Sequence, residues 1–169
     1  NNIVTSKTKI GRAGGIDLQS EQVEGIWFNN IIWGNRSNVS IQDGQGWRNN
    51  ISLIAKSQPH RIVSGYNNIE FLDIYDDGED YNFWNQSNNS LSLDPGFVNP
   101  ASNYRLTDAS PLIGAGTMTY DGRTTFNEDI LGLKRPTPDG SNPDIGAYEN
   151  KLASSPYPVQ VLGVAALPR

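Results

Sequence analysis

A short motif of tryptophan, paired asparagines and isoleucine recurs along the first part of the chain. Trp27-Phe28-Asn29-Asn30-Ile31 returns twenty positions later as Trp47-Arg48-Asn49-Asn50-Ile51. Asn67-Asn68-Ile69 follows eighteen positions after the second copy, and Asn1-Asn2-Ile3 stands twenty-eight positions before the first. Self-similarity at a period near twenty is typical of stacked repeats. The motif therefore predicts a solenoid of short coils.

The residues after each asparagine pair alternate between apolar and polar, as in Ile51-Ser52-Leu53. Alternation at period two indicates a short strand with one buried face. If the isoleucine of each copy points inward, the first asparagine, two positions earlier, points inward as well. We therefore expect a ladder in which each amide donates to one neighbour and accepts from the other. The predicted ladder consists of Asn1, Asn29, Asn49 and Asn67 beside Ile3, Ile31, Ile51 and Ile69. Chance recurrence in an asparagine-rich chain is the alternative, and the shared isoleucine and tryptophan positions argue against it.

Composition places the chain in the all-β class. The 169 residues are 36% apolar and include 17 glycines and 10 prolines, which suits one modest domain with many turns. The net charge of −5 and the lack of a lysine and arginine cluster argue against nucleic acid as a partner. The chain contains no run of eighteen apolar residues, so the sequence predicts no membrane span. With no cysteine, the chain has no disulfide, thiol chemistry or cysteine-bound zinc.

The pattern divides the chain into three parts. Residues 1–93 carry the predicted β-helix coils, about four in number; residues 94–149 are a segment punctuated by proline and glycine; and residues 150–169 are a linker or tail. Residues 94–149 are expected to lie over the exposed edge of the last coil and to protect it from end-to-end pairing. The chain begins inside a repeat, without an initiator methionine or signal peptide, so we expect earlier coils to precede Asn1.

An acidic loop interrupts the repeats at residues 73–80. Its side-chain oxygens could ring a hard cation, so calcium is the cofactor that the sequence suggests. The candidate ligands are Asp73, Asp76, Asp77 and Asp80. The spacing does not match an EF-hand loop, and a solvated acidic loop is the simpler interpretation.

Two arrangements are candidates for catalysis on polysaccharide. A lyase needs a base and a positive charge beside the substrate carboxylate, and the candidates are Lys56, His60 and Arg61, which lie close together in the sequence. A glycoside hydrolase needs two carboxylates that face one groove, which Asp17 and Asp43 at neighbouring strand ends would have to supply. Turn residues are the simpler interpretation of both sets.

The tryptophans suggest a binding surface as a third function. Trp27 and Trp47 repeat at the predicted coil spacing, so their rings are expected one above the other, roughly 4.8 Å apart along the axis. Trp33 and Trp84 lie near them in the sequence. Exposed rings at coil spacing would stack on sugar faces, whereas buried rings would fill the coil. The sequence does not decide between the two.

The second half of the chain carries an ordered series of motifs. These are Asp94-Pro-Gly-Phe-Val-Asn-Pro, Asn103-Tyr-Arg-Leu, Ser110-Pro-Leu-Ile-Gly-Ala-Gly-Thr117, Arg135-Pro136 and Asp144-Ile-Gly-Ala-Tyr-Glu149. Together with Asn29-Asn-Ile-Ile-Trp-Gly-Asn35, the series resembles the C-terminal end of bacterial right-handed parallel β-helix proteins that are pectate-lyase-like, and most of all those of the choice-of-anchor Q type. The resemblance covers about residues 1–149.

This resemblance implies more about fold than about activity. The fold it implies is a right-handed parallel β-helix with an irregular C-terminal cap. It also implies secretion or display on the bacterial cell surface. Such proteins include polysaccharide lyases, surface proteins of unknown activity and presumed adhesins. The expected partners are the remainder of a longer β-helix chain or a larger surface assembly, and polysaccharide.

We therefore expect a non-catalytic, edge-capping part of an extracellular β-helix protein, with a contribution to glycan binding or adhesion. The alternative is part of a polysaccharide lyase or glycoside hydrolase that acts on acidic polysaccharide, with its main site in earlier coils.

Overall fold

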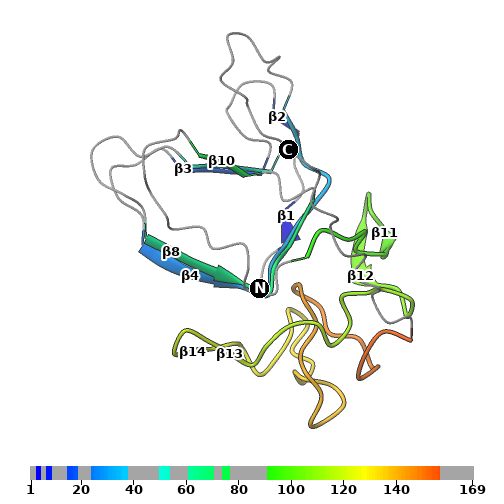
Figure 1. The fold of residues 1–169 in the computed structure, drawn as a ribbon. Coiled ribbons are helices and arrows are strands. Elements are labelled where there is room, and N and C mark those ends of the chain that lie inside the picture. Colours follow the sequence, from blue (N-terminus) through cyan, green and yellow to red (C-terminus); the bar gives the residue numbers. More distant parts are fainter. Residues whose placement is uncertain are drawn as a thin grey trace, which may run out of the picture.

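The computed structural model describes residues 3–4, 7–8, 15–18, 24–37, 50–53, 61–70, 74–76 and 91–156 (Figure 1). Within these ranges the chain forms short strands and turns and contains no α-helix. The all-β prediction is therefore confirmed for the described part of the chain. The strands form several small sheets.

Every strand pair in the first half of the described chain is parallel, and each pair joins segments far apart in sequence. One sheet has the order β1-β5-β9, and a second has the order β3-β7-β10. Two further pairs are β4 with β8 and β2 with β6. The strands are β1 (Ile3–Val4), β2 (Lys7–Thr8), β3 (Ile16–Leu18), β4 (Glu24–Phe28), β5 (Ile31–Ile32), β6 (Arg36–Ser37), β7 (Ile51–Leu53), β8 (Arg61–Gly65), β9 (Asn68–Ile69) and β10 (Ile74–Asp76).

The pairings correct the predicted register of the repeats. Ile3 pairs with Ile31 as predicted. The prediction for Ile51 is wrong, because this residue pairs with Ile16 and Ile74 in another sheet. The copy at Asn67-Asn68-Ile69 is shifted by one residue, since Ile31 pairs with Asn68 and not with Ile69. The asparagine–isoleucine motif therefore marks similar strand entries on different sheets, and its period of twenty is not the spacing between paired strands.

Backbone corners explain the one-residue shift. Phe28 at the end of β4 pairs with Gly65 at the end of β8, so the next residues, Asn29 and Tyr66, occupy equivalent corners. Both have the left-handed backbone conformation, with φ of 57° at Asn29 and 52° at Tyr66. Asparagine adopts this conformation readily and tyrosine seldom does. The first corner was therefore predictable from its asparagine, whereas the second was not, because a tyrosine occupies it.

The predicted ladder is wrong for Asn29, which does not bind Asn67, while Asn1 and Asn49 lie outside the described residues. In the shifted register the partner of Asn67 is the second asparagine of the first copy. Asn30 donates from Nδ2 to Oδ1 of Asn67 over 2.8 Å. Asn67, which is 1% exposed, donates in turn to the Trp27 carbonyl at 3.0 Å and to Ser64 Oγ at 2.9 Å. A second buried amide pair links Asn35 Nδ2 to Asn50 Oδ1 over 3.0 Å. These bonds satisfy amides that would otherwise be costly to bury.

Replacing Asn67 with alanine is expected to lower the free energy of unfolding by about 1–3 kcal/mol, because the Trp27 carbonyl and the Asn30 amide lose a buried partner. Urea denaturation measures the loss. Asn99→Ala is the matched control, since Asn99 is exposed and its side chain accepts only a local bond from the Ala101 amide. Equal losses in the two variants would contradict a stabilising role for the buried bonds of Asn67.

Adjacent isoleucines of β5 face opposite sides, as alternation along a strand requires. Ile32 pairs with Ile69, and both are buried. Ile31 instead belongs to a cluster with residues of the C-terminal segment, namely Leu106, Leu112, Ile113 and Ile145. The prediction that Ile31 and Ile69 point to the same side is therefore wrong. The register shift brings Ile32 level with Ile69 and turns Ile31 toward the second half of the chain.

Residues 94–149 form loops and two antiparallel hairpins beside the parallel strands (Figure 1). The hairpin strands are β11 (Phe97–Asn99), β12 (Asn103–Leu106), β13 (Thr119–Tyr120) and β14 (Arg123–Thr124). Just before this segment, Leu91 extends the edge of β9 by forming a parallel bridge with Asn68. The Leu91 amide donates to the Asn67 carbonyl at 2.6 Å, and its carbonyl accepts from the Ile69 amide at 2.9 Å.

Candidate functional site

Most of the residues singled out from the sequence lie outside the described ranges. Lys56, His60, Asp43, Trp47, Trp84, Asp73, Asp77 and Asp80 belong to this group, as do residues 157–169 of the tail. Arg61 begins β8, Asp17 lies in β3 and Asp76 ends β10, but only the backbone of these three is described. The catalytic and calcium candidates therefore stay predictions. Within the described part of the chain, no group of three or more metal-ligating side chains comes together.

Two of the four tryptophans are described, and both are half-buried. Trp33 packs against the cluster that contains Ile31. Trp27 lies in β4, and its paired neighbour in β8 is Ser64. The residue paired with Trp27 is thus 37 positions away and not 20, and Trp47 lies outside the described residues. Glycan contact at Trp27 stays a prediction.

The best-defined site in the structure is the contact between the C-terminal segment and β4, β5 and β8. Asn29 is 0% exposed and binds Thr117 twice, since its Nδ2 donates to the Thr117 carbonyl at 2.7 Å and its Oδ1 accepts from the Thr117 amide at 2.9 Å. The Gly146 amide donates to the Asn29 carbonyl at 2.9 Å. The first asparagine of the motif therefore binds the C-terminal segment and not the asparagine of a neighbouring coil.

Close approach at this contact depends on glycine. A Cβ at Gly146 would lie 2.7 Å from Ile31 Cδ1, and the φ of Gly146 is 115°. A Cβ at Gly65 would lie 2.6 Å from the Tyr120 ring, whose hydroxyl donates to the Ser64 carbonyl at 2.7 Å. Both distances are shorter than real Cβ contacts, so the two glycines allow the segment to lie directly on the strands.

A buried ion pair lies at the centre of the C-terminal segment. Arg135 Nε is 2.7 Å from Glu149 Oε2, and the two side chains are 0% and 1% exposed. Glu149 also accepts the backbone amides of Thr137 at 3.0 Å and Asp144 at 3.2 Å. Burial raises the pKa of Glu149, and Arg135 acts in the opposite direction. Arg135 Nη1 and Nη2 have no hydrogen-bond partner among the described residues.

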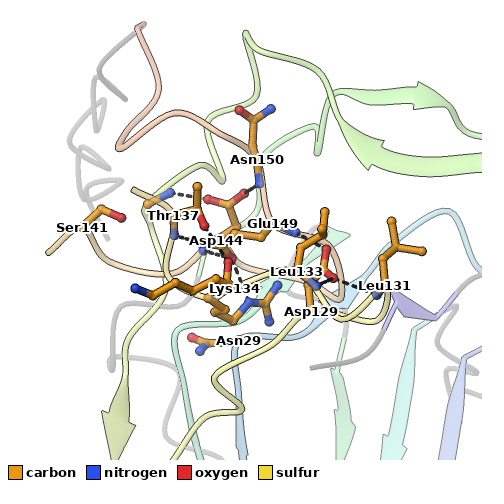
Figure 2. A network of polar contacts seen from close by, with 12 residues as sticks. Asn29, Asp129, Leu131, Leu133, Lys134, Thr137, Ser141, Asp144, Glu149 and Asn150 are labelled. Carbon is orange, nitrogen blue, oxygen red and sulfur yellow. Dashed lines mark hydrogen bonds and ion pairs between the residues drawn. The ribbon is translucent and has the colours of Figure 1, made fainter. Parts of the chain in front are cut away.

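Asp144, which lies beside Glu149 in Figure 2, connects this ion pair to the loop that contains Gly114. Its Oδ1 accepts the Gly114 amide at 2.8 Å, and its Oδ2 accepts the Asn150 amide at 2.7 Å. The side chain is 0% exposed. Burial, followed by the nearby Glu149 carboxylate, raises the pKa of Asp144 to about 7.

Asp129 fixes the hairpin turn that precedes Arg135. Its Oδ1 accepts the amides of Leu131 at 2.7 Å and Leu133 at 3.0 Å, and its Oδ2 accepts the Glu149 amide at 3.2 Å. Figure 2 shows Leu131 and Leu133 extending from this turn. Asp129 thus links the turn to the backbone of Glu149.

The cluster can hold loops together, but its geometry does not suit chemistry on a substrate. A general acid or base must reach the proton that it transfers. Asp144 has a suitable pKa but is fully buried, and its two oxygens are occupied by backbone amides. Two shallow hollows lie beside the cluster. One, of about 360 Å³, lies between Phe126, Ile130 and Ala147, and the other, of about 230 Å³, lies between Arg105 and Tyr148.

The raised pKa of Asp144 predicts that stability falls as pH rises. Between the ordinary value of 3.8 and the folded value of about 7, the folded state binds more protons than the unfolded state. The contribution is therefore present at low pH and is lost as pH rises through the folded pKa. We expect the free energy of unfolding to decrease by about 2 kcal/mol from roughly pH 5.5 to pH 8.

Denaturation at a series of pH values measures this slope. Asp144→Asn removes the titrating group, so its slope should be flatter whatever its absolute stability. Asp108→Asn is the control, because Asp108 is 64% exposed. An unchanged slope in Asp144→Asn would show that another group carries the dependence.

The sequence motifs found the members of this cluster without revealing how they are connected. Arg135-Pro136 and Asp144 to Glu149 were both recognised as motifs. Their signal was two carboxylates at the ends of an apolar run, together with a cation nine positions upstream of the first. Such residues are rarely buried unless they are paired, so a pair was inferable. Asp129 carried no such signal.

Comparison with known proteins identifies no relative: no protein family model, curated protein or solved structure matches the chain. In the described ranges, no helix has the length and apolar character needed to cross a membrane.

Proposed function

We propose that the chain is a non-catalytic, edge-capping part of an exported bacterial parallel β-helix protein. In this proposal residues 1–93 are coils of a right-handed parallel β-helix, and residues 94–149 cap them. The observation that supports it best is the combination of parallel pairing in both three-stranded sheets with a C-terminal segment that binds one of them. Parallel pairing requires a crossover between partners, as successive coils provide. Export and a place on the cell surface rest on the resemblance of the sequence motifs.

The bonds of Leu91, which lies just before the capping segment, support edge protection. An uncovered strand edge presents free amide and carbonyl groups that pair with other chains. Leu91 occupies the edge of β9 with both its amide and its carbonyl, and Leu93 adds a further bond from its amide to Asn68 Oδ1 at 2.9 Å. Replacing Leu91 with proline removes the amide and should accelerate ordered aggregation.

Thioflavin T fluorescence and electron microscopy measure this aggregation. Leu91→Ala is the matched control, because it shortens the side chain and leaves the edge bonds in place. Equal rates of aggregation in the two variants would contradict edge protection by the backbone of Leu91.

The enzyme alternative is tested directly with substrates. We expect no release of unsaturated sugars when the chain is incubated with alginate, pectin or chondroitin. Release that is lost in Lys56→Ala or Arg61→Ala would overturn the non-catalytic proposal. Glycan binding at the tryptophans is tested with a glycan array, on which Trp27→Ala should lose any signal that the unmodified chain gives.

Calcium binding by residues 73–80 is a separate part of the proposal. A ligand that binds only the folded state raises the melting temperature. Calcium should therefore raise the melting temperature of the chain, and Asp73→Asn combined with Asp77→Asn should remove the effect. The same transition in calcium and in chelator would end this part of the proposal.

A further inference from the structure

The tip of the β13–β14 hairpin is an aspartate followed by a glycine. Asp121 and Gly122 connect the two strands, and Tyr120 pairs with Arg123 on either side of them. Both residues of the turn have positive φ, 44° at Asp121 and 73° at Gly122, as the tightest hairpin turns require. Both are exposed. The turn therefore presents the Asp121 side chain and the peptide bond after it to water.

Three features favour a reaction between the Asp121 side chain and the Gly122 amide. Gly122 has no Cβ, and nothing lies within 4 Å of the place where one would stand. Within the described part of the chain, neither the Asp121 carboxyl group nor the Gly122 amide has a hydrogen-bond or ion-pair partner. The strands of the hairpin are only two residues long, so the turn can deform at little cost.

We propose that Asp121 is a site of spontaneous isomerisation to isoaspartate. The Gly122 amide nitrogen attacks the side-chain carboxyl carbon, Cγ, so that an N–Cγ bond forms, and the amide hydrogen leaves with the hydroxyl group as water. Water then opens the resulting succinimide ring. Cleavage of the new N–Cγ bond restores aspartate, whereas cleavage of the original peptide bond leaves the chain connected through Cγ. One water is released and one is taken up, so the reaction requires no oxidant and no cofactor.

The pair Asp139-Gly140 provides a contrast within the same chain. It is also exposed, Gly140 has a φ of 83°, and nothing lies within 4 Å of its Cβ position. The Asp139 carboxylate, however, lies 2.5 Å from Lys134 Nζ. This carboxyl group must leave its ion pair before the glycine nitrogen can attack it. The dipeptide alone predicts similar rates at the two sites, whereas the structure predicts a faster reaction at Asp121.

Isomerisation would alter the contact between the hairpin and β8 (Figure 1). The Tyr120 ring packs edge-on against Tyr66 with centroids 5.8 Å apart, and its hydroxyl binds the Ser64 carbonyl. Isoaspartate adds one carbon atom to the backbone of the turn, so Tyr120 and Arg123 can no longer pair in the same register. We therefore expect the modified chain to lose the contact of Tyr120 with the parallel strands.

Peptide mapping of the full chain after prolonged incubation under native conditions measures the reaction, because fragmentation by electron transfer distinguishes isoaspartate from aspartate. We expect isoaspartate to form at Asp121 faster than at Asp139 by a factor of roughly two to five, the range that an exposed ion pair supplies. In urea, where the chain is unfolded, the two rates should be similar.

Two controls separate the effect of structure from that of sequence. Lys134→Ala removes the ion pair, so it should raise the rate at Asp139 and leave the rate at Asp121 unchanged. Asp108 is 64% exposed and precedes an alanine, so it should react much more slowly than Asp121. Hydrogen exchange on the separated isoaspartate form should be faster in residues 119–125 than in the unmodified chain.

Three results would overturn the proposal. The first is a fraction of isoaspartate at Asp121 no greater than that at Asp108, which would show that the folded hairpin prevents the reaction. The second is a rate at Asp139 that equals or exceeds the rate at Asp121 in the folded chain. The third is hydrogen exchange in residues 119–125 that isoaspartate leaves unchanged, which would contradict the expected loss of the Tyr120 contact.

Discussion

Replacing Arg135 with alanine is expected to lower the free energy of unfolding by about 3–5 kcal/mol, the largest single effect that the structure predicts. Arg135 and Glu149 form an ion pair with both side chains almost completely buried. Removing the cation leaves the Glu149 carboxylate buried without its charge partner. The loss should shrink at lower pH, because protonation then removes the uncompensated charge.

Two further variants separate this effect from a general loss of packing. Lys134→Ala breaks an exposed ion pair with Asp139, in which the side chains are 65% and 76% exposed, so its cost should be about 0–1 kcal/mol. Arg135→Met combined with Glu149→Gln removes both charges, and this double variant should be more stable than Arg135→Ala. Urea denaturation provides all the values. A loss below about 1 kcal/mol in Arg135→Ala would show that the ion pair is not a main support of the segment.

Replacing Ile31 with alanine is expected to cost about 2–5 kcal/mol, because this side chain is 0% exposed and joins β5 to the C-terminal segment. Leu112→Ala, also at 0% exposure in the same cluster, should have a similar cost. The two losses should not be additive, with a coupling of roughly 0.5–3 kcal/mol, since residues in one cluster share a cavity after truncation.

Urea denaturation of the two single variants and the double variant gives a double-mutant cycle, which measures this coupling. Val98→Ala provides the control with Ile31→Ala, and its cost should add to that of Ile31→Ala because Val98 is exposed and outside the cluster. Additive losses for Ile31 and Leu112 would contradict packing of the C-terminal segment on β5.

The sequence was sufficient for the class of fold but not for its register. Glycine, proline and asparagine content, together with alternation after each asparagine pair, predicted short strands, and Ile3 does pair with Ile31. The period of twenty failed because similar strand entries recur on different sheets, as Ile51 does. The one-residue shift at Asn68 depends on a left-handed tyrosine corner at Tyr66, which residue preferences do not predict.

The candidate site was less predictable than the fold. Composition drew attention to Lys56 and His60 and to the acidic loop, all of which lie outside the described residues. The buried cluster of Arg135, Asp144 and Glu149 joins positions from separate turns, and only the tertiary fold brings them together. Its motifs were visible in the sequence, but the burial that raises the pKa of Asp144 was not.

β4 and β8 pair in parallel, and the fold proposed for residues 1–93 depends on this register. The chain contains no cysteine, so a pair of introduced cysteines reports on this register without background. Ile26 pairs with Val63 in the structure, and neighbouring strands lie roughly 4.8 Å apart, a separation that a disulfide bond can span. Ile26→Cys with Val63→Cys should therefore form an intramolecular disulfide under mild oxidation, whereas Trp27→Cys with Trp47→Cys should not. A disulfide in the second pair and none in the first would contradict this register.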